Sequence, residues 1–444
     1  MGWFDTLISF IEKKFVTTIA KYGVEKKHIL LTEFVTLSVI LFLLQPAVIW
    51  MMPKVLFYIL AIVSPLALLF SIWNLWQIYA RSKFIKAQEK VLLEITFPHK
   101  FMKTPRAMET FLSAIHINPG ESTVTGMYIK GSTRPYWSLE LLSKEGELHF
   151  YIWTWRKFQS IVETQFYSMY PEAKLTEVKD YMDGIVADLD KVSIWGTDYK
   201  FTKNDAYPIK SYVDWGLDKV TSSTKPENVI DPFDTILEKF ASIGEGEVAV
   251  LHIMFQMTRS KTWKKEVEDE IDKIYKNRSQ EITDIADPDK VVEGWAQLRP
   301  QDYDVVNTLR HSIEKDAFDV GIRSLYIARK DAFKPAVRIG GNHVHLFRAF
   351  EVPHLNYLVG TAHWLAGYDY PWHDPRQKIQ NILRRKIIDA MKRRSYFNPP
   401  YSFDPLVLTT EELATIFHLP LNLSKKQRVS PQTDTKTIPK NLPI

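Results

Sequence analysis

Apolar residues dominate two uncharged runs near the start of the chain, residues 34–52 and 55–80, which are separated only by Pro53 and Lys54. A helix needs about 20 apolar residues, with a rise of about 1.5 Å each, to cross a bilayer, so both runs are long enough. The pattern therefore predicts a two-helix transmembrane hairpin over residues 29–80, with its turn at Pro53 and Lys54. A buried hairpin in the core of a soluble protein is the alternative interpretation.

Basic residues on both sides of these runs predict the orientation of the hairpin. Because cytoplasmic flanks of membrane helices are rich in lysine and arginine, both termini are expected in the cytoplasm. The protein is then a multi-pass protein of the cell (inner) membrane. The flanking residues are Lys13, Lys14, Lys21, Lys26 and Lys27 before the first run and Arg81, Lys83, Lys86 and Lys90 after the second, whereas the turn has only Lys54.

Residues 1–28 are predicted to form an amphipathic juxtamembrane helix. Their apolar residues recur at helical spacing ahead of the lysines, which is typical of a helix that lies on a lipid surface. A short helix packed against another subunit explains the same pattern equally well. These apolar residues are Trp3, Phe4, Leu7, Ile8, Phe10 and Ile11.

Beyond the hairpin, alternating and helical apolar patterns follow one another in a recognisable order. They predict a strand over 91–97, a helix over 105–115, a strand pair over 136–142 and 147–154, a helix over 156–169 and a strand over 174–181. Strand, helix, strand, strand, helix, strand is the order of the split βαβ sandwich. Residues 81–190 are therefore predicted to be a first ferredoxin-like domain.

A second, looser round of the same order is predicted over residues 191–352. Its segments are a strand at 191–201 or 209–215, a helix at 232–241, a strand at 247–257, a helix at 303–315 and a strand at 321–330, with a charged helix at 263–279 as an insertion. A helical region over 353–423 and a flexible, linker-like tail over 424–444 follow. The predicted fold class is thus α+β, with a transmembrane hairpin, two ferredoxin-like units and a helical C-terminal region.

Composition narrows the chemistry. The chain has no cysteine, which excludes disulfides and every thiolate reaction. Its formal net charge of +5 over 444 residues is modest, so the overall charge does not indicate a strong nucleic-acid binder.

Several segments resemble a known family. Over almost its whole length, the chain is similar to the membrane and pre-motor region of type IV secretion, conjugal DNA-transfer ATPases. The resemblance implies a membrane-anchoring and docking subunit, with membrane lipid and a separately encoded motor ATPase as partners and a hexameric ring as the homo-oligomer. The segments that carry it are 137–140, 150–152, 162–163, 170–173, 180–181, 318–323, 326–328 and 408–420.

A phosphate-binding loop, G-x-x-x-x-G-K-[ST], is not found in the sequence. Gly340 and Gly341, for example, are followed by Asn342 and His343. The resemblance implies that the motor lies on another polypeptide and that residues 424–444 correspond to the linker that leads to it. The prediction is therefore a protein that is not an enzyme, with no catalytic residue and no cofactor.

A cluster of histidines supports a rival interpretation, a metal-dependent, membrane-bound hydrolase. His343 and His345 would share one face of a strand, as two ligands of one zinc ion do. The other spacings match no zinc pattern, and the aromatic neighbours favour structural histidines, so no metal ligand is assigned. The cluster consists of His343, His345, His354, His363 and His373, with Asp369 and Asp374 among them.

A basic helix predicted over residues 376–394 supports a third class, a membrane protein that contacts DNA. Its apolar positions, Ile379, Ile382, Leu383, Ile387 and Met391, lie on one side. The cations around the rest suit DNA phosphates, anionic lipid or an acidic patch on the motor, although a solvated helix end explains them as well. The candidate contact residues are Arg384, Arg385, Lys386, Lys392, Arg393 and Arg394.

Overall fold

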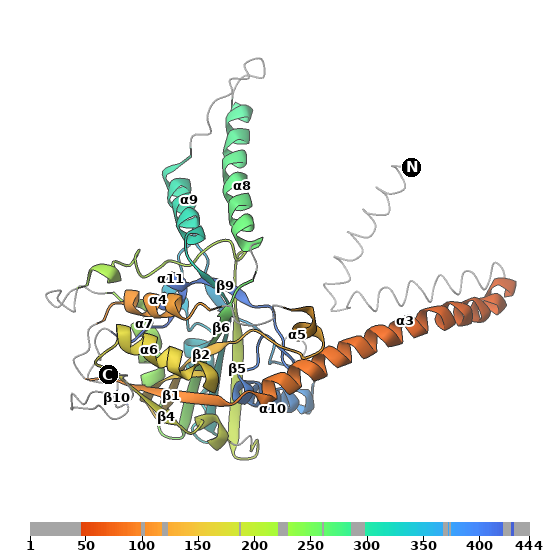
Figure 1. The fold of residues 1–444 in the computed structure, drawn as a ribbon, viewed down its shortest axis with the longest axis horizontal. Coiled ribbons are helices and arrows are strands. Elements are labelled where there is room, and N and C mark those ends of the chain that lie inside the picture. Colours follow the sequence, from red (N-terminus) through yellow and green to blue (C-terminus); the bar gives the residue numbers. More distant parts are fainter. Residues whose placement is uncertain are drawn as a thin grey trace. The chain divides into compact units, whose positions relative to one another are not determined.

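A computed structural model describes residues 46–98, 103–117, 123–185, 188–220, 230–259, 262–285, 298–366, 372, 374–420 and 428–429 (Figure 1). Contacts divide the chain into two units, Met1–Trp76 and Gln77–Ile444. The predicted helix over residues 1–28 and the first apolar run up to residue 45 lie outside the described residues.

Helix α3, Pro46–Ala87, is continuous over 42 residues and passes through Pro53 and Lys54. The predicted turn at these two residues is therefore wrong. An internal proline such as Pro53 removes a single backbone hydrogen bond, and a long apolar helix tolerates that loss. Counted over the described residues alone, no helix is long and apolar enough to cross a membrane.

The first half of the compact unit follows the predicted order of elements. The β2–β3 hairpin turns at Glu145 and Gly146, which both have positive φ, 54° and 89°. The strands pair antiparallel in the order β4-β1-β3-β2. The elements are β1 (Lys90–Thr96), α4 (Pro105–Ala114), α5 (Val124–Tyr128), β2 (Trp137–Lys144), β3 (Glu147–Trp155), α6 (Gln159–Met169) and β4 (Lys174–Val178).

The second half has the strand order β6-β7-β5-β8. Read from β8, this order corresponds strand by strand to the first half read from β4. Of the two segments predicted as its first strand, 191–201 forms β5 and 209–215 forms turns. The principal elements are β5 (Val192–Phe201), α7 (Pro232–Ala241), β6 (Glu247–Met257), β7 (Ala317–Arg329) and β8 (Leu358–Gly360). Short helical turns lie at Arg156–Phe158, Tyr181–Gly184, Leu217–Lys219, Pro335–His343 and Arg348–Phe350.

Helices α8 (Thr262–Ile285) and α9 (Pro300–Ile313) both lie in the connection between β6 and β7. The prediction that the helix over 303–315 belongs to the second sandwich is therefore wrong, because α9 packs beside α8 (Figure 1). Their contact buries Trp263 and Val267 of α8 with Val306 and Leu309 of α9. The charged face of α8 had indicated an insertion, and the structure extends that insertion to both helices.

The two halves form one sheet, in which β2 pairs antiparallel with β6. In the complete order, β4-β1-β3-β2-β6-β7-β5-β8, the strands of the second half follow those of the first half in reversed order. Strand β9 (Leu406–Thr409) extends the sheet beside β7, and β10 (Arg428–Val429) pairs parallel with β3. The prediction of an α+β protein is confirmed.

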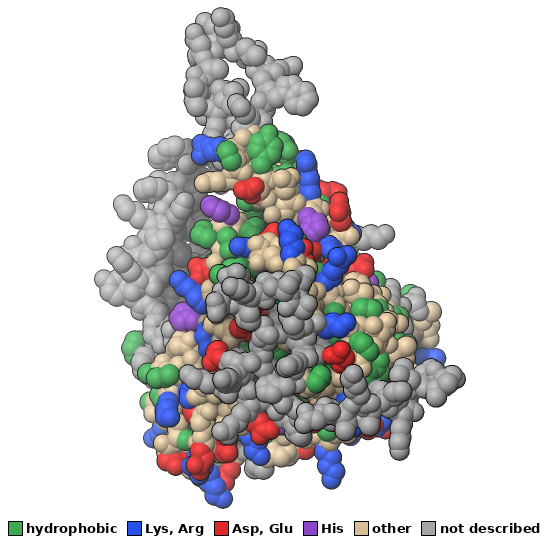
Figure 2. Space-filling view, turned by 90° about the vertical axis from the view of Figure 1, so that its left-hand side faces the viewer, with side chains coloured by type: hydrophobic (Ala, Val, Ile, Leu, Met, Phe, Trp, Pro, Cys, Tyr) green, Lys and Arg blue, Asp and Glu red, His purple; other side chains and the backbone are tan. Residues whose placement is uncertain are grey.

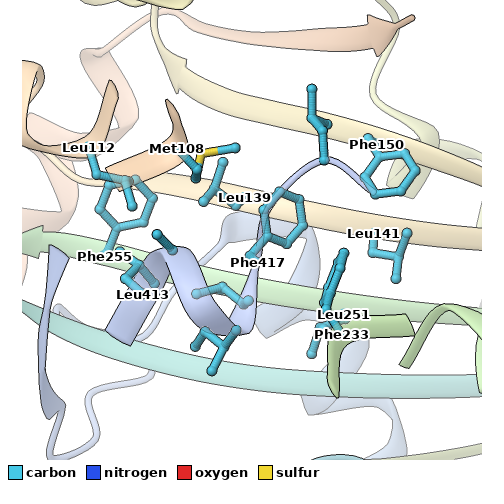
Figure 3. Packing of buried hydrophobic residues seen from close by; sticks show 14 of the residues in the cluster. Met108, Leu112, Leu139, Leu141, Phe150, Phe233, Leu251, Phe255, Leu413 and Phe417 are labelled. Atoms are coloured by element: carbon cyan, nitrogen blue, oxygen red, sulfur yellow. The ribbon is translucent and has the colours of Figure 1, made fainter. Parts of the chain in front are cut away.

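Helices cover both faces of this sheet. On one face, α4, α6, α7 and α11 (Thr410–Ile416) bury the larger cluster of apolar side chains. Figure 3 shows Leu413 and Phe417 lying among side chains of α4, α7 and the central strands. On the other face, α10 (Lys378–Arg393) and the chain after β4 cover a second, aromatic-rich cluster.

The region over 353–423, predicted to be helical, also contributes strands β8 and β9 to the sheet. Every residue from Leu408 to Pro420 is buried. This segment, which carries part of the family resemblance, is thus a core segment of the fold. In the tail predicted to be flexible, residues 428–429 form β10 and the others lie outside the described residues.

Candidate functional site

Helix α10 carries the predicted contact residues and packs on the sheet through one short apolar face. Ile387, Ile388, Ala390 and Met391 are buried in the aromatic-rich cluster. The helix approaches β5 closely, because a Cβ atom at Gly196 would lie 2.2 Å from Cδ1 of Ile387. A side chain at this strand position would therefore force the Ile387 side chain to move and would press on the backbone oxygen of Ser324, 2.9 Å away.

The apolar face of α10 is shorter than predicted. Ile379 and Ile382 are 50% and 52% exposed, so these two residues of the predicted apolar side lie outside the part that the sheet buries. The amphipathic spacing continues into the first turns of the helix, but the sheet beneath the helix supports only its second half. Two apolar side chains therefore remain on the surface beside the basic residues.

The six predicted basic residues do not form one surface. Arg385 and Lys386 are exposed, and Lys392 is half-buried. Arg384 donates to Oδ1 of Asn381 at 2.9 Å, and Arg393, 57% exposed, donates to Oδ2 of Asp389 at 2.8 Å. Arg394 is wholly buried, so the prediction that it contacts DNA, lipid or a partner is wrong.

Arg394 instead ends α10 inside a buried charge cluster. Its Nε donates to Oε1 of Glu140 at 2.9 Å, and Nη2 donates to Oδ1 of Asp180 at 3.0 Å. The hydroxyl of Tyr181 donates to Oε2 of Glu140 at 2.6 Å and lies 2.6 Å from Nε2 of His252. Glu140 and His252 face each other across the β2–β6 pair, so this cluster lies where the two halves of the sheet join.

The cluster fixes the charge states of its members. Burial would raise the pKa of Glu140, but Arg394 and His252 outweigh it and lower the pKa well below the usual range. Burial lowers the pKa of His252 despite the nearby Glu140, which keeps the imidazole neutral near pH 7. Removing one partner of a buried ion pair typically costs about 3–5 kcal/mol because the other charge is left uncompensated, so Glu140 and Arg394 depend on each other.

A second buried arginine fixes the residue after Arg394. Nε of Arg323 donates to Oδ1 of Asp198 at 2.6 Å, and Nη1 donates to the backbone oxygen of Ser395 at 3.1 Å. Asp198 and Arg323 oppose each other on β5 and β7. The guanidinium also lies 5.0 Å from the ring centre of Trp364, within cation–π range. Adjacent residues 394 and 395 are thereby tied to both halves of the sheet.

The histidine cluster does not assemble in the described structure. His343 ends the helical turn Pro335–His343 instead of lying on a strand, so the prediction of a strand face shared with His345 is wrong. His343 is buried with Nδ1 2.6 Å from Oγ of Ser324, whereas His345, His354 and His363 are exposed. His373 and Asp369 lie outside the described residues. Within the part of the chain that is described, no three His, Asp or Glu residues are placed to hold a metal ion.

A pocket of about 210 Å³ between α9 and α11 contains another group of charges. Nε2 of His311 lies 2.9 Å from Oε2 of Glu411, which Lys315 also contacts at 2.9 Å. Burial raises the pKa of Glu412 to about 7. Its carboxylate accepts the backbone N–H groups of Ile209 and Thr409, both at 2.8 Å, so Glu412 serves the capping box that starts α11.

Sequence reasoning missed the partners of Arg394, although a signal for them exists. Glu140 is the only ionisable residue from 137 to 143, and His252 the only one from 248 to 257, and buried ionisable groups of this kind need a partner. On the face drawn in Figure 2, basic and acidic side chains are interspersed, in keeping with the modest net charge.

No protein-family model matches this chain, and no curated protein matches it either.

Proposed function

We propose that this chain is a membrane-anchored cytoplasmic platform that docks the motor ATPase of a type IV secretion or conjugation-like machine. We also propose that the sheet consists of two ferredoxin-like units that are joined edge to edge. The docking function is inferred from the resemblance of segments such as 137–140 and 408–420 to the pre-motor region of those ATPases.

The observation that carries the membrane anchor is the exposure of α3. Every residue from Val63 to Trp76 is exposed, and Phe70 alone is 69% exposed. Soluble monomers rarely expose such continuous apolar surface, and a helix that is apolar all round belongs in a core or a membrane. From the sequence, the proposal keeps the expectation that the uncharged apolar run over residues 55–80 is a membrane segment.

The polar residues of this run suit a lipid environment. Oγ of Ser71 donates to the backbone oxygen of Ala67 at 2.8 Å, and Nδ2 of Asn74 donates to that of Phe70 at 3.0 Å. Hydrogen bonds within the helix remove the cost of placing these groups in hydrocarbon. Trp73, Trp76 and Tyr79 then precede Arg81 and Lys83, the order of an aromatic belt followed by a cytoplasmic basic flank.

Alkaline extraction of membranes from cells expressing the full chain tests the anchor. The chain should stay in the membrane pellet and leave it only with detergent. Replacing Leu66, Leu69 and Phe70 with lysine should release it, because each central lysine costs about 2.5–3.5 kcal/mol on insertion. These side chains are exposed, so the compact unit should still fold. Recovery of the unaltered chain in the aqueous fraction would refute the anchor.

Docking requires a separate test with the detergent-solubilised chain. A nucleotide-binding ATPase identified in the purified complex should rebind when both proteins are mixed again in pure form. Nucleotide hydrolysis by the chain alone, or rebinding that fails, would contradict the docking function.

DNA contact by α10 is the second candidate, supported by exposed Arg385 and Lys386. Retention of DNA that weakens with salt and is lost in the R385Q/K386Q variant would favour it.

A further inference from the structure

A pocket of about 100 Å³ lies between the end of α3, the start of β1 and the chain that follows α10. Its polar and charged lining consists of Ser82, Lys86, Lys90, Arg393, Arg394 and Asn398, together with Ser395, and none of its lining residues is acidic. Lys86 and Lys90 come from one side of the pocket and the two arginines from the other. All of these residues belong to the compact unit Gln77–Ile444.

The pocket concentrates positive charge. Lys90 keeps solvent contact, but burial lowers the pKa of its ammonium, and Arg394 and Arg393 lower it further. Three carboxylates moderate this field from outside the lining, and one of them, Glu140, pairs with Arg394. Asp389 pairs with Arg393, and Asp180, bonded to Arg394, acts on Lys90 in the opposite direction. An anion in the pocket would relieve the repulsion among the cations.

The size and walls of the pocket limit the anion. A volume of about 100 Å³ is well below the 300–1,000 Å³ typical of pockets for drug-sized ligands, so it suits a phosphate group better than a whole nucleotide. The remaining walls include Ile85, Tyr136 and Phe397. A lining that is partly apolar and partly cationic suits an anion that is attached to an apolar body.

The position of the pocket indicates the source of the phosphate. Ser82 and Lys86 follow Tyr79 in the same helix, about 5 and 10 Å further along its axis. The headgroup layer is about 5–8 Å thick on each side of the hydrocarbon. Because Tyr79 belongs to the aromatic belt proposed for the headgroup level, Ser82 and Lys86 follow at the cytoplasmic edge of that layer, where long lysine side chains reach the lipid phosphates.

We propose that this pocket binds the phosphate of an anionic phosphomonoester lipid, such as phosphatidic acid, at the cytoplasmic surface. The inference rests on the proposed membrane anchor. A phosphomonoester carries up to two negative charges and several acceptor oxygens, which match the ammonium groups of Lys86 and Lys90 and the guanidinium of Arg393. A phosphodiester headgroup such as phosphatidylcholine has less charge to offer and a cation of its own.

Calorimetric titration of the full chain in non-ionic detergent tests the proposal with three probes. They are dihexanoylphosphatidic acid, dihexanoylphosphatidylcholine and inorganic phosphate. We expect the phosphatidic acid to bind at least ten times more tightly than either other probe. The K86Q/K90Q variant should lose that preference, whereas K83Q/K130Q, which removes the same charge outside the pocket, should keep it within twofold.

Equal affinity for inorganic phosphate and the lipid would assign the pocket to free phosphate and overturn the proposal. Equal loss of lipid affinity in both variants would do the same, because it would reflect general charge. Alkaline extraction of membranes that contain the wild-type chain distinguishes a failure of the pocket proposal from a failure of the membrane anchor. A chain that resists extraction but shows no lipid preference disproves the pocket alone, whereas a chain that is extracted disproves the anchor.

Discussion

Replacing Arg394 with methionine should destabilise the protein strongly, although this residue belongs to a run of basic residues on a helix end. The change leaves Glu140 without its buried cation and Asp180 without its partner. Removing one partner of a buried pair typically costs about 3–5 kcal/mol of unfolding free energy. The adjacent R393M variant is the matched control. Arg393 is 57% exposed and pairs with Asp389 near the surface, so its loss should cost less than about 1 kcal/mol.

The size of the Arg394 effect should depend on pH. In the unaltered protein, the lowered pKa of Glu140 contributes stability above the unfolded-state pKa, and that stability is lost only as the pH falls through the folded-state value. In R394M, burial without the guanidinium should raise the pKa of Glu140 above the unfolded value. The native state then binds the proton more tightly, so the deficit should shrink between pH 7 and pH 5.

Urea unfolding of the full chain in non-ionic detergent, followed by tryptophan fluorescence, measures both effects. Trp153 lies 5.8 Å from the guanidinium of Arg394 and reports on the site. The double variant E140Q/R394M should lose less than the sum of the single variants, by about 1–3 kcal/mol, because the partners are in contact. Equal losses in R394M and R393M, or strict additivity in the double variant, would refute the buried-cluster account.

Two further predictions concern packing and protonation. Burial, with smaller contributions from Lys239 and Arg338, lowers the pKa of His343 to about 3, so the unfolded state takes up a proton below pH 6.5 that the native state does not. The unfolding free energy should therefore fall by about 2 kcal/mol between pH 7 and pH 5. In urea unfolding, H343Q should remove this part of the pH dependence. An unchanged pH dependence in H343Q would contradict the prediction. G196A should cost about 1–3 kcal/mol of unfolding free energy through overpacking against Ile387. Adding I387V to G196A should recover part of this loss in thermal unfolding. Additive losses in the double variant would contradict the close approach.

Local patterns predicted the first half of the sheet to within a few residues. The alternation from Trp137 to Leu142, the turn at Glu145 and Gly146 and the proline that starts α4 are signals contained within ten residues. They need no knowledge of the rest of the chain. The capping box of Thr409 and Glu412 was equally visible, although its segment was interpreted only by resemblance.

The errors arise where distant partners decide the outcome. Arg394 has the sequence context of a solvated helix end, and its buried partner Glu140 lies 254 residues away. Strand β8 has three residues, too few to show a period, and only its pairing with β5 defines it. Pro53 indicated a break because proline disfavours a helix interior. The helix nevertheless continues through Pro53, with apolar residues on both sides of it.

The connection between α3 and the sheet determines how the protein would bear mechanical load. Only Gln88 and Glu89 separate the helix from β1, and β1 has a hydrogen-bonded neighbour on each side, β3 and β4. A force along β1 would be shared by these ladders at the same time, in shear, instead of opening them one bond after another. In the proposed membrane-anchored platform, tension on α3 would thus enter the fold through an internal strand, where it resists rupture best.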